Sequence, residues 1–331
     1  LEEILTSGPS SINFLNLPIS APSSAALRML WIERRPDLIH LATEGPLGFS
    51  ALRTAHQLEI PVTSDFRTNA HLYVRHHGLG ILSRLVLDYL RYFHNRTLIT
   101  TVPTEGLRSY LSDSGFSNLK VLGRGIDAQA YSPCHRSDAL RMAWGASKDD
   151  FVLLFVGRLI PEKNLVLLAN AYQAVLRRDR SVKLVVVGDG PGRNYLQSAL
   201  PTAILCGNRF GADLAEHYAS ADLFLFPSLT DTFGNVVLEA LASGLPVVAF
   251  NEGAASVHVT DLINGRLCSD HQNDFIDALL SLYRLYVEDI AGFRRFSKAA
   301  RLSVLSAGWP SIANQFVSLA EEAIHAHSQV L

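Results

Sequence analysis

The sequence lacks the marks of several protein classes. Its three cysteines are scattered without CxxC spacing, which argues against a structural zinc site and indicates a reducing compartment. No apolar run approaches the ~20 residues that cross a bilayer, and no signal-peptide pattern opens the chain. A net charge of −2 gives no reason to expect nucleic acid as a partner. These absences predict a cytoplasmic protein.

What the chain does have is a regular alternation of short apolar runs and amphipathic segments. With 331 residues, 48% of them hydrophobic, two domains are the default expectation. Strands are predicted near 37–43, 60–65, 97–102, 119–122, 151–157, 182–188, 203–206, 222–227 and 246–250. Apolar strands that alternate with helices form parallel sheets covered by helices on both faces.

We therefore predict an α/β fold of two doubly wound, Rossmann-like domains that face a cleft. The segment RGIDAQAYSPCHRS (124–137) breaks the alternation and is interpreted as an interdomain linker. The predicted domains are 1–126 and 127–309, and a C-terminal helix over 310–331 is expected to cross back to the first domain.

Ligands of such sheets bind at the carboxyl ends of the strands, and three loops of the second half matter there. The first, FVGRLIPEKNL, follows a strand that ends at Gly157 and carries Arg158 and Lys163 ahead of a helix start near Asn164. Two cations beside a helix start suit a diphosphate. An ordinary turn with solvated cations remains the alternative.

The second loop, VVVGDGPGRNYL, fails as a dinucleotide fingerprint because Arg193 stands where G-x-G-x-x-G needs its third glycine. Gly188 and Gly190 are interpreted as a tight turn that lines the cleft. A turn without any ligand is equally compatible with these residues.

The third loop, LFPSLTDTFGNVVLEALASG, leads into a helix that starts around Phe233–Asn235. Gly234 would let a ligand approach the backbone, and the free amides of Gly234, Asn235 and Val236 could hold a phosphate. Phe233 is counted with these donor-binding residues.

Two acids frame that helix. Asp231, ahead of it, could accept hydrogen bonds from sugar hydroxyls, and Glu239, more than a turn inside it, suits a vicinal diol such as a ribose. An N-cap aspartate and an incidental glutamate are the alternative. A glutamate in the otherwise apolar run VVLEALA weakens that alternative, because buried carboxylates are rare unless paired.

These residues resemble the retaining glycosyltransferases of family 4, which have the GT-B fold. The resemblance rests on FVGRL..EKN, on VGDGP, and on two acids with seven residues between them followed by ASGLPVV. It is closest to the GDP-mannose-dependent lipid α-mannosyltransferases of bacteria and to sulfoquinovosyltransferases, through SDF.TN.H, RY.HN.T...TVPT and LFPSLTDTFGNVVLEA.

The resemblance implies a role for each loop. Arg158 and Lys163 would bind the donor diphosphate, Asp231 the transferred hexose and Glu239 the ribose, while Gly207 and Arg209 in the CGNR loop would flank the nucleobase. Asp231 stands where many relatives have glutamate. The donor would be a GDP- or UDP-linked sugar, with no cofactor and no metal needed for the chemistry. No residue is an obvious nucleophile, which fits front-face displacement with retention.

In the first domain the resemblance points to SDFRTNAH. Many relatives have, where Arg67 stands, a histidine that touches the donor sugar, and His71 in the same motif is the candidate to replace it. A solvated or capping histidine is the alternative for His71. Arg67 and Asn69 are assigned to the acceptor side.

Residues 67–96 hold five arginines and four histidines against one acid, Asp88. A basic, apolar surface of this kind predicts a lipid acceptor and contact with the inner face of an anionic membrane. A core helix with one solvent-exposed stripe is the alternative to the membrane surface. A soluble polysaccharide or a small molecule is the alternative to the lipid acceptor.

The relatives open with a strand and a glycine loop, whereas this chain begins close to a later strand. We therefore expect the first domain to lack its first strand, so that the strands near 37–43 and 60–65 lose a neighbour. Such a chain would bind a nucleoside diphosphate but transfer sugar poorly. The alternative function is a truncated, inactive nucleotide-sugar-binding remnant.

Overall fold

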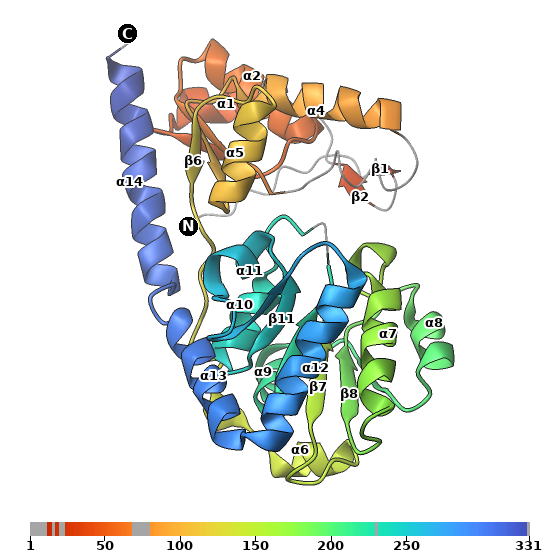
Figure 1. Ribbon diagram of the computed structural model, residues 1–331. Helices are drawn as coiled ribbons and strands as arrows, with labels where there is room; N and C mark the ends of the chain where they lie inside the picture. Colours follow the sequence, from red (N-terminus) through yellow and green to blue (C-terminus); the bar gives the residue numbers. More distant parts are fainter. Residues whose placement is uncertain (1–11, 15–16, 20–23, 68–79, 229–230, 330–331) are drawn as a thin grey trace. The chain divides into compact units, whose positions relative to one another are not determined.

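The computed structural model describes residues 12–14, 17–19, 24–67, 80–228 and 231–329 (Figure 1). The chain divides into two compact units. Unit 1 comprises residues 1–123 and 313–331, and unit 2 comprises residues 124–312. Segment 124–137 belongs to unit 2, and the long helix α14 (Trp309–Ser328) begins in unit 2 and continues in unit 1.

Unit 2 is built on a six-stranded parallel sheet in the order β12-β11-β10-β7-β8-β9. The strands are β7 (Val152–Val156), β8 (Lys183–Val187), β9 (Ile204–Gly207), β10 (Leu223–Phe226), β11 (Val247–Phe250) and β12 (Gly265–Cys268). The order reverses between β7 and β10, and a doubly wound sheet binds its ligand at such a switch point.

Helices cover both faces of this sheet (Figure 1). They are α6 (Asp138–Ala143), α7 (Leu165–Leu176), α8 (Arg193–Ala199), α9 (Gly211–Ser220), α10 (Asn235–Ala242), α11 (Gly253–His258), α12 (Gln272–Glu288) and α13 (Ile290–Ser303). Two short 3-10 helices, Pro133–His135 and Pro161–Lys163, precede α6 and α7.

The apolar pattern of β7 explains this two-sided cover. Leu154 and Val156 pack into the cluster that includes residues of α9, α10 and α11, while Leu153 and Phe155 pack into the cluster under α7 and α12. Successive side chains of a strand point to opposite faces. Every position of β7 is buried, so the strand needs apolar residues throughout.

Unit 1 holds a four-stranded parallel sheet in the order β3-β4-β5-β6. Its strands are β3 (Ile39–Leu41), β4 (Val62–Asp65), β5 (Ile99–Val102) and β6 (Leu119–Val121), and its other helices are α1 (Ser24–Glu33), α2 (Pro46–Gln57), α4 (Gly80–His94) and α5 (Glu105–Asp113). A separate antiparallel pair joins β1 (Ile12–Phe14) to β2 (Leu17–Ile19).

One expectation about this sheet was wrong. β4 does not lose a neighbour, since it pairs with β3 on one side and with β5 on the other. Among the described strands, β3 forms one edge of the sheet and β6 the other.

Candidate donor site in unit 2

Three of the predicted glycines meet at the carboxyl ends of β7, β8 and β9. Gly188 donates its amide to the carbonyl of Gly207 at 2.8 Å, and Gly157 donates to that of Val187 at 3.0 Å. A Cβ on Gly188, whose φ is +128°, would lie 2.0 Å from the carbonyl oxygen of Gly157. Only glycine allows this backbone contact. The carboxyl ends of β7, β8 and β9 are therefore held close together by backbone hydrogen bonds.

The loop after β7 carries the two predicted cations. Arg158 is exposed directly after the strand. Lys163 is largely buried, with its side chain 13% exposed. Asn164 then adopts a left-handed conformation, with φ of 51°, and its side chain caps α7 by accepting from the amide of Leu167.

Lys163 and Asp231 come together across the switch point. Lys163 Nζ lies 2.5 Å from Asp231 Oδ2, and the Asp231 side chain is 26% exposed. The ammonium group also lies 5.6 Å from the ring centroid of Phe226 at the end of β10. These two residues were predicted to bind different parts of the donor, whereas the structure pairs them with each other.

Local backbone conformation and packing explain why α10 begins with a glycine. Its N-cap residue is Gly234, with φ of 89°, and a Cβ there would lie 2.9 Å from Phe226 Cζ. The left-handed backbone and the packing against Phe226 therefore require glycine at position 234. The approach of a ligand is not needed to explain this glycine. Within the described residues, the amides of Asn235 and Val236 meet no hydrogen-bond acceptor, as expected for the first turn of a helix. The preceding Phe233 is buried, and its carbonyl accepts from the amide of Ala254 at 2.6 Å.

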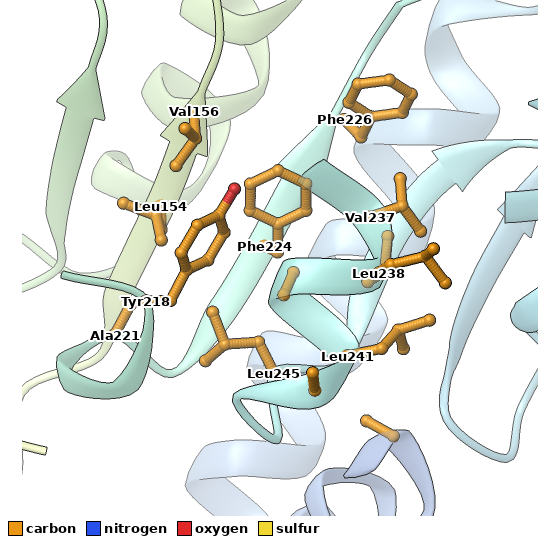
Figure 2. Packing of buried hydrophobic residues seen from close by; sticks show 14 of the residues in the cluster. Leu154, Val156, Tyr218, Ala221, Phe224, Phe226, Val237, Leu238, Leu241 and Leu245 are labelled. Carbon is orange, nitrogen blue, oxygen red and sulfur yellow. The ribbon is translucent and has the colours of Figure 1, made fainter. Parts of the chain in front are cut away.

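Glu239, on the second turn of α10, lies beside two tyrosines. Tyr218 Oη donates to Glu239 Oε2 at 2.8 Å, and the ring of Tyr131 packs edge-to-face against that of Tyr218. Figure 2 shows the Tyr218 ring among the buried side chains near Leu154 and Phe224. Burial raises the pKa of the Glu239 carboxyl, and the neighbouring hydroxyls of Tyr218 and Tyr131 oppose that rise.

Sequence reasoning missed both tyrosines. Tyr131 lies in segment 124–137 and Tyr218 near the end of α9, far along the chain from α10. A signal was nevertheless present, because a carboxylate in an apolar helix needs a hydrogen-bonding partner. Buried tyrosines elsewhere in the chain were the side chains to search.

The loop after β9 folds back on itself. Arg209 donates to the carbonyl of Cys206 at 3.2 Å and pairs with Asp213 on α9 at 3.1 Å. Gly207 has a φ of +70°, and a Cβ on it would meet nothing within 4 Å. There is thus open space beside this loop, where the nucleobase was predicted to lie.

Three of the predicted residues belong to unit 1. Arg67 bonds to Asp65, at the end of β4, with Nε 2.6 Å from Oδ2. Asn69 and His71 lie outside the described residues. Unit 1 also buries a polar relay that the sequence analysis did not single out: Ser64 Oγ lies 2.9 Å from His94 Nδ1, whose Nε2 lies 3.1 Å from Glu44 Oε1.

In the described parts of the chain, no helix is long and apolar enough to cross a membrane. The same parts contain no group of three or more His, Cys, Asp or Glu side chains able to hold a metal ion.

Comparison with known proteins shows what this chain is similar to. Family models match over both halves: "Glycosyltransferase Family 4" over residues 4–130 and "Glycosyl transferases group 1" over residues 150–284. The GDP-mannose-dependent alpha-mannosyltransferase of Mycobacterium tuberculosis is 34% identical over 91% of this chain and 76% of its own. The sulfoquinovosyl transferase SQD2 of Arabidopsis thaliana is 30% identical over 72% of this chain and 48% of its own.

Among solved structures, the Anabaena protein HepE in complex with UDP superposes with a TM-score of 0.76. It is 20% identical and aligns over 90% of this chain and 82% of its own. That likeness shows the fold, which is the GT-B fold predicted from the sequence.

Proposed function

Because this chain belongs to the family 4 glycosyltransferases, we propose that it transfers mannose from GDP-mannose, with retention of configuration, to a lipid-linked or glycolipid acceptor. The 34% identity to a GDP-mannose-dependent alpha-mannosyltransferase supports the donor. The observation that carries the proposal is the Lys163–Asp231 pair beside the start of α10, at the switch point of unit 2.

The pair is proposed to exchange partners when the donor binds. A diphosphate offers Lys163 more negative charge than one carboxylate does, and the positive end of α10 favours the same group. Asp231, released from Lys163, would then accept hydrogen bonds from hydroxyls of the hexose. The Lys163–Asp231 ion pair would therefore hold both side chains close to the groups that they are proposed to bind.

The same residues account for the chemistry. Cleavage of the sugar–phosphate bond leaves an oxocarbenium-like sugar and a diphosphate with extra negative charge. Arg158, Lys163 and the amides of α10 are placed toward the charge that develops, so they stabilise the transition state more than the ground state. In front-face displacement the departing phosphate takes the proton of the acceptor hydroxyl, and the chain then needs neither a nucleophile nor a metal.

One face of α4 supports a lipid acceptor. Leu85, Tyr89 and Tyr92 are 63%, 40% and 47% exposed, and Arg96 Cζ lies 3.6 Å above the Tyr92 ring. The spacing of four and three residues places Leu85, Tyr89 and Tyr92 in one stripe along α4, and Arg96 follows just after the helix end. Exposed apolar and aromatic side chains beside arginine suit the interface of an anionic bilayer, so we propose peripheral membrane contact through this stripe.

The direct test is transfer itself. The purified chain is incubated with radiolabelled GDP-mannose, UDP-glucose or UDP-sulfoquinovose and bacterial lipid extract, and label in the organic phase is counted. Lipid-soluble label from GDP-mannose is expected, with the α-linkage seen by NMR. Arg158→Ala and Lys163→Ala should each lower the rate by about 10²-fold, while Arg177→Ala, exposed after α7, serves as the control.

Three outcomes would contradict the proposal. Label only in a water-soluble polysaccharide would refute the lipid acceptor. Nucleotide binding without any transfer would favour an inactive nucleotide-sugar-binding protein. A β-linked product would refute retention.

A further inference from the structure

We propose that Tyr131 and Tyr218 are positioning residues that orient the Glu239 carboxylate for a ribose diol, and so determine the preference for ribonucleotides. This inference rests on the proposed function, since it assumes that Glu239 faces the ribose of the donor. The supporting geometry is the 2.8 Å hydrogen bond from Tyr218 to this carboxylate and the edge-to-face packing of Tyr131 against Tyr218.

The number of hydrogen bonds fits this role. An ionised carboxylate has about four acceptor positions on its two oxygens. The Tyr218 hydroxyl occupies one of them, and the Tyr131 hydroxyl would take a second when it turns toward the carboxylate, which leaves two for the pair of hydroxyls of a vicinal diol. A carboxylate without the tyrosines could turn about its terminal torsion, which is broad for glutamate, and would present the diol with many orientations.

Both tyrosines are fixed in place and remain donors. Tyr218 is fully buried, and its ring lies 5.7 Å from that of Tyr131 in an edge-to-face arrangement. Burial, with the charge of Glu239 as the next cause, raises the pKa of Tyr131 to about 12 and that of Tyr218 well above its ordinary value. Each hydroxyl therefore keeps its proton at neutral pH and can only turn it toward an acceptor.

A further contact ties Tyr131 to the helix that carries Glu239. Arg301 on α13 donates to the carbonyls of Tyr131 and Ala128 at 2.6 Å each, and to that of Ala242, the last residue of α10, at 2.5 Å. One guanidinium thus links segment 124–137 to α10. The tyrosine and the carboxylate therefore lie in the same compact unit and are joined through Arg301, which suits an oriented binding group.

The experiment compares ribose with a sugar that lacks the diol. Isothermal titration measures binding of GDP and of 2′,3′-dideoxy-GDP to the full chain and to Tyr131→Phe, Tyr218→Phe, the double variant and Glu239→Gln. We expect the parent to prefer GDP by roughly 10-fold or more, as for hydrogen bonds to a charged group. The double variant should lose most of that preference while its affinity for dideoxy-GDP stays within about twofold of the parent's.

Tyr172→Phe is the matched control. Tyr172 is equally buried in unit 2, but its hydroxyl bonds to the carbonyl of Val182 at 3.2 Å, at the other end of β8. This variant should keep the ribose preference of the parent. Melting temperatures of all variants show that each is folded at the temperature of titration.

The outcomes separate the positioning role of the two tyrosines from the assignment of Glu239 to the ribose. If the double variant loses affinity for both nucleotides equally, or keeps the preference, the positioning role is refuted although Glu239 can still bind ribose. If Glu239→Gln keeps the full preference of the parent, the ribose assignment within the proposed function fails, and the role of the tyrosines fails with it.

Discussion

Replacing Asp231 by asparagine separates binding of the diphosphate from transfer of the sugar. Asp231 Oδ2 lies 2.5 Å from Lys163 Nζ, so in the proposed exchange a diphosphate displaces the carboxylate to bind the ammonium group. Exposed ion pairs contribute about 0.2–1 kcal/mol, and breaking buried ones costs about 3–5 kcal/mol. With both side chains partly exposed, we estimate a coupling of about 1–2 kcal/mol between these limits.

Asp231→Asn is therefore expected to tighten GDP binding by about 5- to 30-fold, since 1.4 kcal/mol is a factor of ten. Mannose transfer should fall by about 10²-fold in the same variant, because the hexose loses a charged hydrogen-bond acceptor. Isothermal titration with GDP and the radiolabel assay measure the two effects on one preparation. Asp149→Asn removes the same charge from an exposed loop before β7 and should change neither quantity.

Weaker GDP binding by Asp231→Asn than by the parent would refute the exchange of partners. It would mean that Asp231 positions Lys163 for the diphosphate rather than competing with it. Unchanged transfer would remove Asp231 from the hexose site.

Four further predictions test other parts of the structure. Gly188→Ala should lower the free energy of unfolding by about 3–5 kcal/mol, because its Cβ would meet a backbone oxygen at 2.0 Å. Gly207→Ala has open space around its Cβ and should lower the free energy of unfolding by about 1 kcal/mol, because of its left-handed φ alone. Urea titration measures both changes. Burial raises the folded-state pKa of Glu239, so the ionised carboxylate destabilises the fold once the pH rises above the ordinary pKa of a glutamate. Glu239→Gln should therefore have a higher melting temperature than the parent at pH 8, and the difference should shrink at pH 4. Dialysis against EDTA should leave the transfer rate unchanged, and a loss restored by Mg²⁺ would contradict metal-independent chemistry. Leu85→Ser with Tyr92→Ser should reduce sedimentation with phosphatidylglycerol vesicles by about tenfold without lowering the melting temperature, and equal sedimentation would refute the membrane-facing stripe.

The strands of the two parallel sheets were predictable because their burial leaves a local signal. Buried parallel strands must be apolar at every position, and VLLFV and LFLF show that composition directly. β12, in contrast, was not predicted. Its sequence GRLC is short and contains a glycine and an arginine, so its place at the sheet edge comes from pairing with β11 and not from its own residues.

The site shows the same division. Loop motifs revealed which residues follow the strand ends of unit 2, but the partner of each side chain is set by long-range packing. Lys163 and Asp231 are 68 residues apart in sequence, and no local pattern pairs them. Gly234 was predicted for a reason that the structure does not require, since the Phe226 ring and a left-handed backbone already account for it.

The two chain crossings between the units lie next to each other on unit 2. Ile126 donates its amide to the carbonyl of Ala307 at 2.9 Å and pairs with Gly308, and a Cβ on Gly125 would lie 2.6 Å from the Trp309 ring. In topological terms, residues 124–312 are an insertion into unit 1, with entry and exit side by side. A domain with adjacent ends can be excised or joined end to end without strain. Residues 124–312 are thus suited to expression as a separate domain, with or without circular permutation. Such a domain would serve for screening nucleotide sugars.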